Sequence, residues 1–294
     1  MSGDPYHLGL LGWPLRHSLS PDIHTAALQA LDLSGDYQLL PMPPLPGGEA
    51  YLNGVLERMR RAELHGLNVT VPHKQVILGY LDRLTPVAQA IGAVNTIFRQ
   101  GEELVGDNTD RDGFLKDLGA TLSPRVGGAM ILGAGGAARA IAHGLCALGW
   151  QVWIGARSLK RAGDLVDVLR KQGFQSVSVL SLKPDELKAI VPDCTLIVNA
   201  TPLGMVPQTE ASPWPLTMAF PTGASVYDLV YMPEETMLTK AASKAGLRAT
   251  TGVGMLIEQA ALSFERWTSQ PAPRRVMRKA ALKAMTSTQR TGGG

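Results

Sequence analysis

The sequence predicts a two-domain α/β protein, and three observations support this fold class. A chain of 294 residues suits two domains better than one, since single cores stop growing at about 250–300 residues. Apolar residues make up 45% of it, which is enough for a core in each domain. Short apolar runs alternate with helix-like segments, and a glycine-rich turn follows one such run at residues 133–139. We expect a mixed-sheet substrate domain, residues 1–110 plus 251–294, and a Rossmann-like dinucleotide-binding domain, residues 111–250.

The first half alternates strands and helices, which indicates a mixed α/β sheet. Its first strand is the apolar run at residues 7–12, which ends in glycine. The first helix is expected over residues 20–31, with Ser20 as N-cap and Pro21 as the first helical residue. The other strands are expected at residues 36–41, 64–71, 93–99 and 103–106, and the other helices at residues 48–62 and 88–91.

The second half has the pattern of a parallel sheet with crossover helices. An apolar strand at residues 128–132 leads into the glycine-rich turn, and an alanine-rich helix follows at residues 137–148. Further strands are expected at residues 151–154, 195–198 and 224–227, and further helices at residues 160–172, 236–245 and 255–268. We expect the C-terminal helices to return to the first domain.

The positive charge of the chain is concentrated in its C-terminal segment. The net charge is +3, and residues 271–294 carry six cations and no acid, which leaves the rest of the chain at −3. A solvated helical face is the preferred interpretation of this segment, over contact with RNA or an anionic membrane. Aromatic residues make up only 5%, which argues against a surface that stacks nucleobases. We expect neither nucleic acid nor membrane as a partner.

Cysteine usage and the lack of a long apolar stretch predict a reducing, cytoplasmic setting. Cys146 and Cys194 have no Cys-x-x-Cys or zinc spacing and are interpreted as small core residues, so no metal site is expected. Residues 1–13 show no basic leader before an apolar core, and no stretch reaches about 18 apolar residues. The oligomeric state is left open, with a homodimer as one option.

One lysine and one aspartate are the strongest candidates for catalysis. Lys74 follows a predicted strand in the run at residues 68–74, and Asp110 ends the run at residues 106–110. A lone lysine is more often a surface ion-pair partner, but a Lys/Asp pair ahead of a dinucleotide turn suggests hydride transfer at a polar carbon. The amine would donate to the oxygen on which charge develops, and the carboxylate would orient the amine. Proton transfer by Lys74 and charge stabilisation alone both stay open.

The glycine-rich turn indicates a nucleotide site. Gly133, Gly135, Gly136 and Ala138 lie between a predicted strand and helix, where the backbone can approach a pyrophosphate and helix N–H groups can face it. A tight structural turn is the alternative.

The residues after the next strand favour NADP over NAD. NAD sites usually have an acidic residue at the end of that strand, and this chain has none there. Arg157 and Arg161 would instead hold a phosphate on the adenosine ribose, with Ser158 donating its hydroxyl.

Hydroxyl and amide side chains supply candidate substrate contacts. Ser18 and Ser20 lie beside a predicted helix N-terminus, where a carboxylate can be held without a cation, although Ser20 could also act only as a cap. His17 and His73 are interpreted as structural or lining groups. The other polar residues at strand ends, where ligands of open α/β sheets gather, are Asn68, Thr70 and Asn95.

Several short motifs occur in one order along the chain. They are Ser18-x-Ser20-Pro21, residues 68–74, residues 92–96, Asn108-Thr109-Asp110, residues 133–139, Asn199-Ala200-Thr201, residues 227–231 and residues 252–259. Together they resemble the shikimate dehydrogenase family over roughly residues 8–267. The resemblance implies NADPH-dependent reduction of 3-dehydroshikimate to shikimate, a step toward chorismate and the aromatic amino acids.

The resemblance also implies roles for single residues. Ser18, Ser20 and Tyr231 should hold the substrate carboxylate. Those that should hold the ring hydroxyls are Lys74, Asn95, Asp110 and Gln259, with Thr70 beside them. Those that should line the cofactor are Gly133, Ala134, Gly135, Gly136, Ala137, Asn199, Thr201 and Met205, with Gly252 and Met255 near the nicotinamide.

Two departures from the family pattern bear on these roles. Residues 156–158 read Ala-Arg-Ser where family members often have Asn-Arg-Thr, which removes one side-chain contact to the phosphate. Arg111 stands where glycine is frequent and would place a cation near Asp110. The alternatives are a quinate/shikimate dehydrogenase that uses NAD, a non-catalytic NADP sensor, and a methylene-tetrahydrofolate dehydrogenase.

Overall fold

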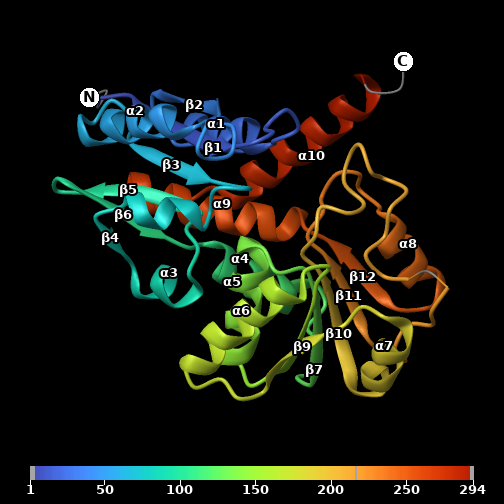
Figure 1. The fold of residues 1–294 in the computed structure, drawn as a ribbon. Coiled ribbons are helices and arrows are strands. Elements are labelled where there is room, and N and C mark those ends of the chain that lie inside the picture. Colours follow the sequence, from blue (N-terminus) through green and yellow to red (C-terminus); the bar gives the residue numbers. More distant parts are fainter. Residues whose placement is uncertain (1–3, 216, 292–294) are drawn as a thin grey trace. The chain divides into compact units, whose positions relative to one another are not determined.

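The computed structural model describes residues 4–215 and 217–291 (Figure 1). The chain divides into two compact units, one formed by Met1–Asp110 with Ile257–Gly294 and the other by Arg111–Leu256. Each unit contains one six-stranded sheet. The second division point lies inside α9 (Val253–Thr268).

The first unit has a mixed sheet, as the sequence predicted. The strand order is β2-β1-β3-β5-β6-β4, in which β5 is antiparallel to β3 and to β6 while the other pairs are parallel. Its elements are β1 (Tyr6–Gly12), α1 (Ser20–Ala30), β2 (Gly35–Pro41), α2 (Glu49–Arg60), β3 (Gly66–Val69), η1 (Val76–Tyr80), β4 (Arg83–Leu84), α3 (Pro86–Ile91), β5 (Thr96–Gln100), β6 (Glu103–Asp107), α9 from Ile257 onward and α10 (Arg274–Thr291).

The second unit is a Rossmann fold, which confirms the predicted fold class. Its six strands are all parallel in the order β9-β8-β7-β10-β11-β12, so the order reverses between β7 and β10, where such folds bind dinucleotides. Its elements are α4 (Asp110–Thr121), β7 (Gly128–Leu132), α5 (Gly136–Ala147), β8 (Gln151–Gly155), α6 (Leu159–Lys171), β9 (Val177–Leu180), α7 (Pro184–Ile190), η2 (Val191–Asp193), β10 (Cys194–Asn199), β11 (Ser225–Asp228), α8 (Met237–Lys244), β12 (Arg248–Thr251) and the start of α9.

Strand β7 shows why this sheet needs helices on both faces. Ala129 and Ile131 point into one apolar core, whereas Met130 and Leu132 point into another, as the two-residue period of a strand requires. The first core also takes side chains from α5 and α6, and the second from α7 and α8. Figure 1 shows these helix pairs on opposite faces of the sheet. Strands buried on both faces give the uninterrupted apolar run in the sequence.

A histidine is buried beneath the sheet of the first unit. The His24 ring is fully buried and stacks on Tyr37, with ring centroids 4.5 Å apart and planes 2° apart. Phe264 and Trp267 of α9 lie against it. Neither ring nitrogen has a hydrogen-bond partner among the described residues. Burial lowers the pKa of His24 to about 3, so the ring is neutral at physiological pH.

Some predicted boundaries were wrong. Ser20 is the first residue of α1 and Leu19 is its N-cap, so Ser20 does not cap the helix as we expected; the chain enters the helix one residue early, with Pro21 in the first turn. The strands expected at residues 64–71 and 93–99 are shorter, at Gly66–Val69 and Thr96–Gln100. The elements that sequence reasoning missed are η1, α4, β4, β9, α7, η2, β12 and α10 as a defined helix.

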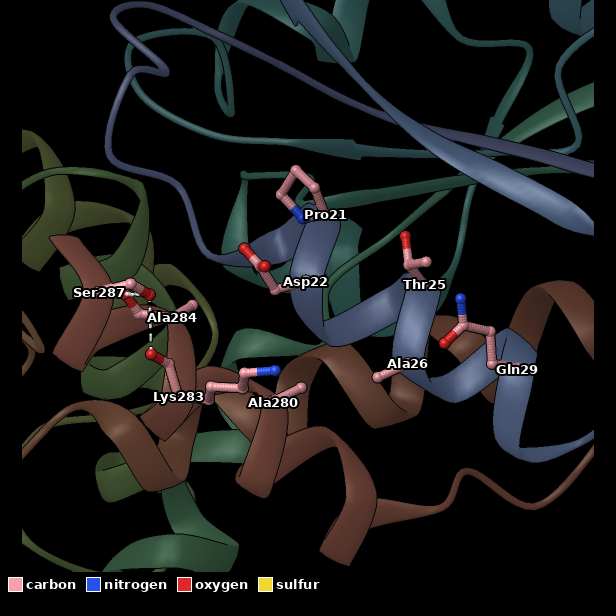
Figure 2. Close-up of a pocket in the computed structure, with 9 residues that line it drawn as sticks. All are labelled: Pro21, Asp22, Thr25, Ala26, Gln29, Ala280, Lys283, Ala284 and Ser287. Carbon is pink, nitrogen blue, oxygen red and sulfur yellow. Dashed lines mark hydrogen bonds between the residues drawn. The ribbon is translucent and has the colours of Figure 1, made fainter.

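The basic C-terminal segment is mostly one helix, α10, which packs on α1. Its buried side chains recur every four residues, at Met277, Ala281 and Met285. Its exposed cations are Arg275, Arg278, Lys279 and Lys283. A groove of about 390 Å³ lies between α1 and α10, with Asp22 on one wall and Lys283 on the other (Figure 2). Across the described part of the chain, no helix combines the length and apolar character that a membrane span requires.

Candidate active site

Lys74 and Asp110 form a short ion pair in the first unit. The Nζ atom of Lys74 donates to Oδ2 of Asp110 at 2.6 Å, and the two side chains are only 13% and 4% exposed. The loop after β3 carries Lys74, and its carbonyl accepts from the N–H of Val94 at 2.7 Å. Asp110 is the first residue of α4, where the helix dipole favours negative charge. Arg111, whose cation we expected near Asp110, forms an ion pair with its neighbour Asp112 at 2.7 Å.

The amide of Asn95 is oriented by a backbone donor. The N–H of Thr109 donates to Oδ1 of Asn95 at 2.8 Å, so the NH₂ group must face the other way. That group donates to Oδ1 of Asp110 at 2.9 Å and lies 3.3 Å from Oε1 of Gln259. Both oxygens of Asp110 therefore face a donor, one from Asn95 and one from Lys74. The direction of the carboxyl group is fixed before any ligand arrives.

Ser263, which the sequence reasoning missed, is linked to Asn95 through the hydroxyl of Thr96. Its Oγ is 2.7 Å from Oγ1 of Thr96 and 3.0 Å from Nδ2 of Asn68, and it donates its own proton to the Gln259 carbonyl at 3.0 Å. Oγ1 of Thr96 in turn lies 3.0 Å from Oδ1 of Asn95. Ser263 follows Gln259 by one helical turn, and this i, i+4 spacing is the signal that could have found it.

The predicted carboxylate contacts lie on the connection from β1 to α1. The Ser20 side chain is buried, and its backbone N–H donates to Oγ of Ser18 at 3.3 Å. Because Leu19 occupies the N-cap position, the Ser20 hydroxyl is not used as a helix cap. Thr70 comes directly after β3 and is half-buried. Tyr231 belongs to the second unit, where it follows β11, and its role in holding the carboxylate stays a prediction.

The two histidines beside these motifs have different surroundings. His73 is buried, and its Nε2 lies 2.8 Å from the Met42 carbonyl, which suits the structural role that we expected. His17 is exposed. Within residues 4–215 and 217–291, no group of three or more His, Cys, Asp and Glu side chains could hold a metal ion.

Two positions in the glycine-rich turn of the second unit differ in why glycine is present. Gly133 has a φ of +122°, and a Cβ there would meet the Ala200 carbonyl oxygen at 2.9 Å, so the fold itself requires glycine. Gly135 is the N-cap of α5, and a Cβ there would meet none of the described atoms within 4 Å. Packing therefore does not explain Gly135. Open space beside the first-turn N–H groups of a helix fits a pyrophosphate.

The cations predicted to select NADP lie on the surface between β8 and α6. Ser158 is the N-cap of α6, and its Oγ accepts from the N–H of Arg161 at 3.3 Å, which leaves its own proton for a ligand. The residues Arg157, Ser158 and Arg161 are all exposed. Lys160, in the same turn, pairs with Asp164 at 3.1 Å. The segment fits a phosphate group on the adenosine ribose.

The other predicted cofactor contacts follow two strand ends of the second unit. Asn199 ends β10, and its Oδ1 accepts from the N–H of Thr201 at 2.9 Å and from the hydroxyl of Thr201 at 2.7 Å. Met205 is 39% exposed, as a side chain that meets a ligand can be. Gly252 follows β12, and Met255 is buried in an apolar core of the unit. Their contacts with a cofactor stay predictions.

Comparison with known proteins assigns the family. A model of the shikimate dehydrogenase substrate binding domain matches residues 10–97, and a model of the shikimate 5'-dehydrogenase C-terminal domain matches residues 252–282. The NADP(+) shikimate dehydrogenase of Symbiobacterium thermophilum is 40% identical over 282 residues, which are 95% of this chain and 94% of that protein. The chain belongs to the shikimate dehydrogenase family. The resemblance predicted from the motifs is confirmed.

Solved structures share the fold of this shikimate dehydrogenase family member. The shikimate 5-dehydrogenase of Thermus thermophilus, in complex with NADP(H) and shikimate, has a TM-score of 0.82 and 38% identity, covering 95% of this chain and 99% of that one. The quinate dehydrogenase of Corynebacterium glutamicum, in complex with NAD, has a TM-score of 0.86 and 29% identity, covering 96% and 100%. Because both match so well, the fold alone does not choose between these substrates and cofactors.

Proposed function

We propose that this chain is an NADP-dependent shikimate dehydrogenase, which reversibly reduces 3-dehydroshikimate to shikimate on the route to chorismate and the aromatic amino acids. The observation that carries the proposal is the largely buried Lys74–Asp110 ion pair with Asn95 beside it, in a chain of this family. A cation, a carboxylate and an amide at one place can hold neighbouring ring oxygens and stabilise charge on one of them. Residues 1–110 plus 251–294 would bind the substrate, and residues 111–250 would bind the cofactor.

Lys74 acts on the reacting oxygen of the substrate. NADPH, when bound, supplies the hydride, and negative charge then develops on that oxygen. The ammonium group of Lys74 has three N–H donors, of which one goes to Asp110, so two stay free to donate to the oxygen and to pass it a proton. Asp110 keeps the amine in place and accepts from the neighbouring ring hydroxyl. Gln259 and Thr70 bind the other hydroxyls, and Ser18, Ser20 and Tyr231 bind the carboxylate.

The choice of NADP rests on the exposed cations after β8. We expect Arg157→Ala to raise the Kd for NADPH about tenfold or more, because a hydrogen-bonded ion pair with the ribose phosphate is lost, and to leave the Kd for NADH within twofold. Fluorescence titration with both dinucleotides measures the two constants. Arg278→Ala, which removes an exposed arginine of α10, is the control. Equal weakening of NADPH and NADH by Arg157→Ala would remove the assignment.

The activity itself is tested by oxidation of shikimate and of quinate, each with NADP⁺ and with NAD⁺. We expect turnover of shikimate with NADP⁺ at a kcat/KM at least about tenfold above the other three combinations. Between the two cofactors, this is the discrimination expected from one well-placed charged contact. Comparable turnover of quinate, or with NAD⁺, would place the protein with the dual-substrate enzymes. Tight NADPH binding without turnover of either acid would mean a sensor.

We also propose a reducing cytoplasmic setting and leave the homodimer to measurement. Both cysteines are buried and free, and burial raises the pKa of the Cys146 and Cys194 thiols to about 11 each, which keeps them unreactive as core residues. Labelling with a thiol reagent under native conditions tests whether the two thiols are unreactive, and rapid reaction of either cysteine would contradict this expectation. Sedimentation of the purified chain decides between a monomer and a homodimer.

A further inference from the structure

Asp228 is a fully buried carboxyl group that has no role in the site described above. It ends β11 and is 0% exposed. Its Oδ1 accepts from Nδ2 of Asn199 at 2.8 Å and from the N–H of Val230 at 3.0 Å, and its Oδ2 accepts from the hydroxyl of Thr236 at 2.7 Å. Burying a carboxyl group costs free energy, and these three donors offset part of it. A buried carboxyl group at the ligand-binding edge of a Rossmann sheet therefore points to a functional role.

The carboxyl group fixes the orientation of the Asn199 amide. An ionised carboxyl group only accepts, so Asn199 turns its NH₂ group toward Asp228, where the Leu203 carbonyl also accepts from it at 3.2 Å, and its oxygen toward Thr201. That oxygen accepts both the N–H and the hydroxyl proton of Thr201. The Thr201 hydroxyl has only one proton, so this proton is used. Its oxygen accepts from the N–H of Leu203 at 3.2 Å and has a second lone pair left.

We propose that Asp228 is a positioning residue for the cofactor segment at residues 199–205, acting through Asn199 to present the Thr201 hydroxyl oxygen as an acceptor. The inference rests on the proposed function, because it takes Thr201 to lie along NADP. It also names the chemistry of the contact. With its proton engaged, Thr201 meets a hydroxyl or an amide N–H of the dinucleotide, and not a phosphate oxygen. A group shared by NADP and NAD is therefore the partner.

A purely structural role for Asp228 would work through α8. Thr236, whose hydroxyl donates to Asp228, is the N-cap of α8 and forms a capping box with Thr239. Thr236→Val removes this hydrogen bond and the cap, which lowers helix stability, but leaves the contact from Asp228 to Asn199 in place. The chain thus offers a matched control, since Asp228 has one branch toward the cofactor segment and one toward α8.

The test measures the Kd of NADPH and NADH for the wild-type chain and for D228N, T201V, D228N/T201V and T236V. We expect D228N to weaken both dinucleotides by about tenfold, because the hydrogen bond that holds Asn199 loses its charged acceptor and becomes a weaker neutral one. T201V should weaken both to a similar extent, and the double variant should be no weaker than D228N alone. T236V should lower the Tm and keep the Kd values within twofold. The KM for shikimate at saturating NADP⁺ should change less than twofold in D228N.

Three results would overturn the inference. They are wild-type dinucleotide affinity in D228N, additive losses in the double variant, and equal weakening of dinucleotide binding by T236V. If D228N does not fold, T201V and T201S decide, since loss in the valine variant with retention in the serine variant is required. Failure of the proposed function looks different, because the wild-type chain itself would then not oxidise shikimate with NADP⁺.

Discussion

Lys74→Ala lowers kcat for shikimate oxidation by about 10²-fold or more, if Lys74 moves the proton of the reacting hydroxyl. The structure gives the reason for a loss in kcat: the amine of Lys74 is held on one oxygen of Asp110, and the other oxygen accepts from Asn95, which is neutral and cannot replace the cation. Steady-state kinetics with saturating NADP⁺ measures the change. An unchanged kcat with a raised KM would mean that Lys74 only binds substrate.

The control for this variant has to separate chemistry from stability. Removing Lys74 leaves the carboxyl group of Asp110, only 4% exposed, without its cation, and breaking a buried pair in this way costs about 3–5 kcal/mol of stability. The double variant Lys74→Ala/Asp110→Asn has no unpaired buried carboxylate at position 110, so it should regain the wild-type Tm without regaining kcat. Lys279→Ala, at an exposed lysine of α10, should change neither. Recovery of kcat in the double variant would contradict the role of Lys74.

Acid destabilises this protein through His24. The pKa of His24 in the folded protein is about 3, against about 6.5 for an unfolded histidine. Below pH 6.5 the unfolded chain therefore binds a proton that the folded chain does not, so the free energy of unfolding falls as the pH falls. Between these two pKa values each pH unit costs about 1.4 kcal/mol, and the whole interval costs roughly 5 kcal/mol. At pH 5 the loss is about 2 kcal/mol.

Urea unfolding between pH 4.5 and 7.5 measures this effect against a variant without the imidazole. His24→Phe keeps an aromatic ring against Tyr37, and His24→Leu is a second replacement in case phenylalanine is too large. The difference in unfolding free energy between wild type and variant should change by about 1.4 kcal/mol per pH unit below pH 6, whatever its absolute level. His17→Leu, at an exposed histidine, gives the reference series. A difference that does not vary with pH would show that His24 takes up its proton in the folded state.

The sequence predicted the Rossmann unit most accurately because its signals are local. The strand at residues 128–132 is apolar throughout, the turn after it contains glycines, and the helix that follows is rich in alanine, so each element agrees with its neighbours. Strand β7 has the predicted bounds, and α5 begins one residue earlier than predicted. By contrast, β4 has only two residues, and β12 reads Arg-Ala-Thr-Thr, too short and too polar for periodicity to reveal it.

The candidate site was predictable where a residue stands in a motif, and not where it acts through another residue. Lys74, Asn95 and Asp110 each belong to a short pattern in the sequence, and the structure brings them together. Ser263 and Asp228 act through hydrogen bonds to residues far away in the chain. The spacing of Ser263 from Gln259 and the motif at residues 227–231 point to the two residues, but neither pattern names the distant partner. The wrong N-cap at Ser20 has a related cause, since serine before proline fits both the cap and the first helical position.

The division of the chain between its two units also determines which unit is completely translated first. The second unit is one continuous stretch, Arg111–Leu256, whereas the first needs Ile257–Gly294 in addition to its opening 110 residues. On the ribosome, Asn95 and Asp110 emerge early, but the partners that Asn95 and Asn68 meet on α9, Gln259 and Ser263, are translated only after the whole Rossmann unit. A nascent chain therefore contains all residues of the Rossmann unit while its substrate half still lacks two of the side chains that hold its amides. The substrate unit is thus the first to begin translation and the last to be completed.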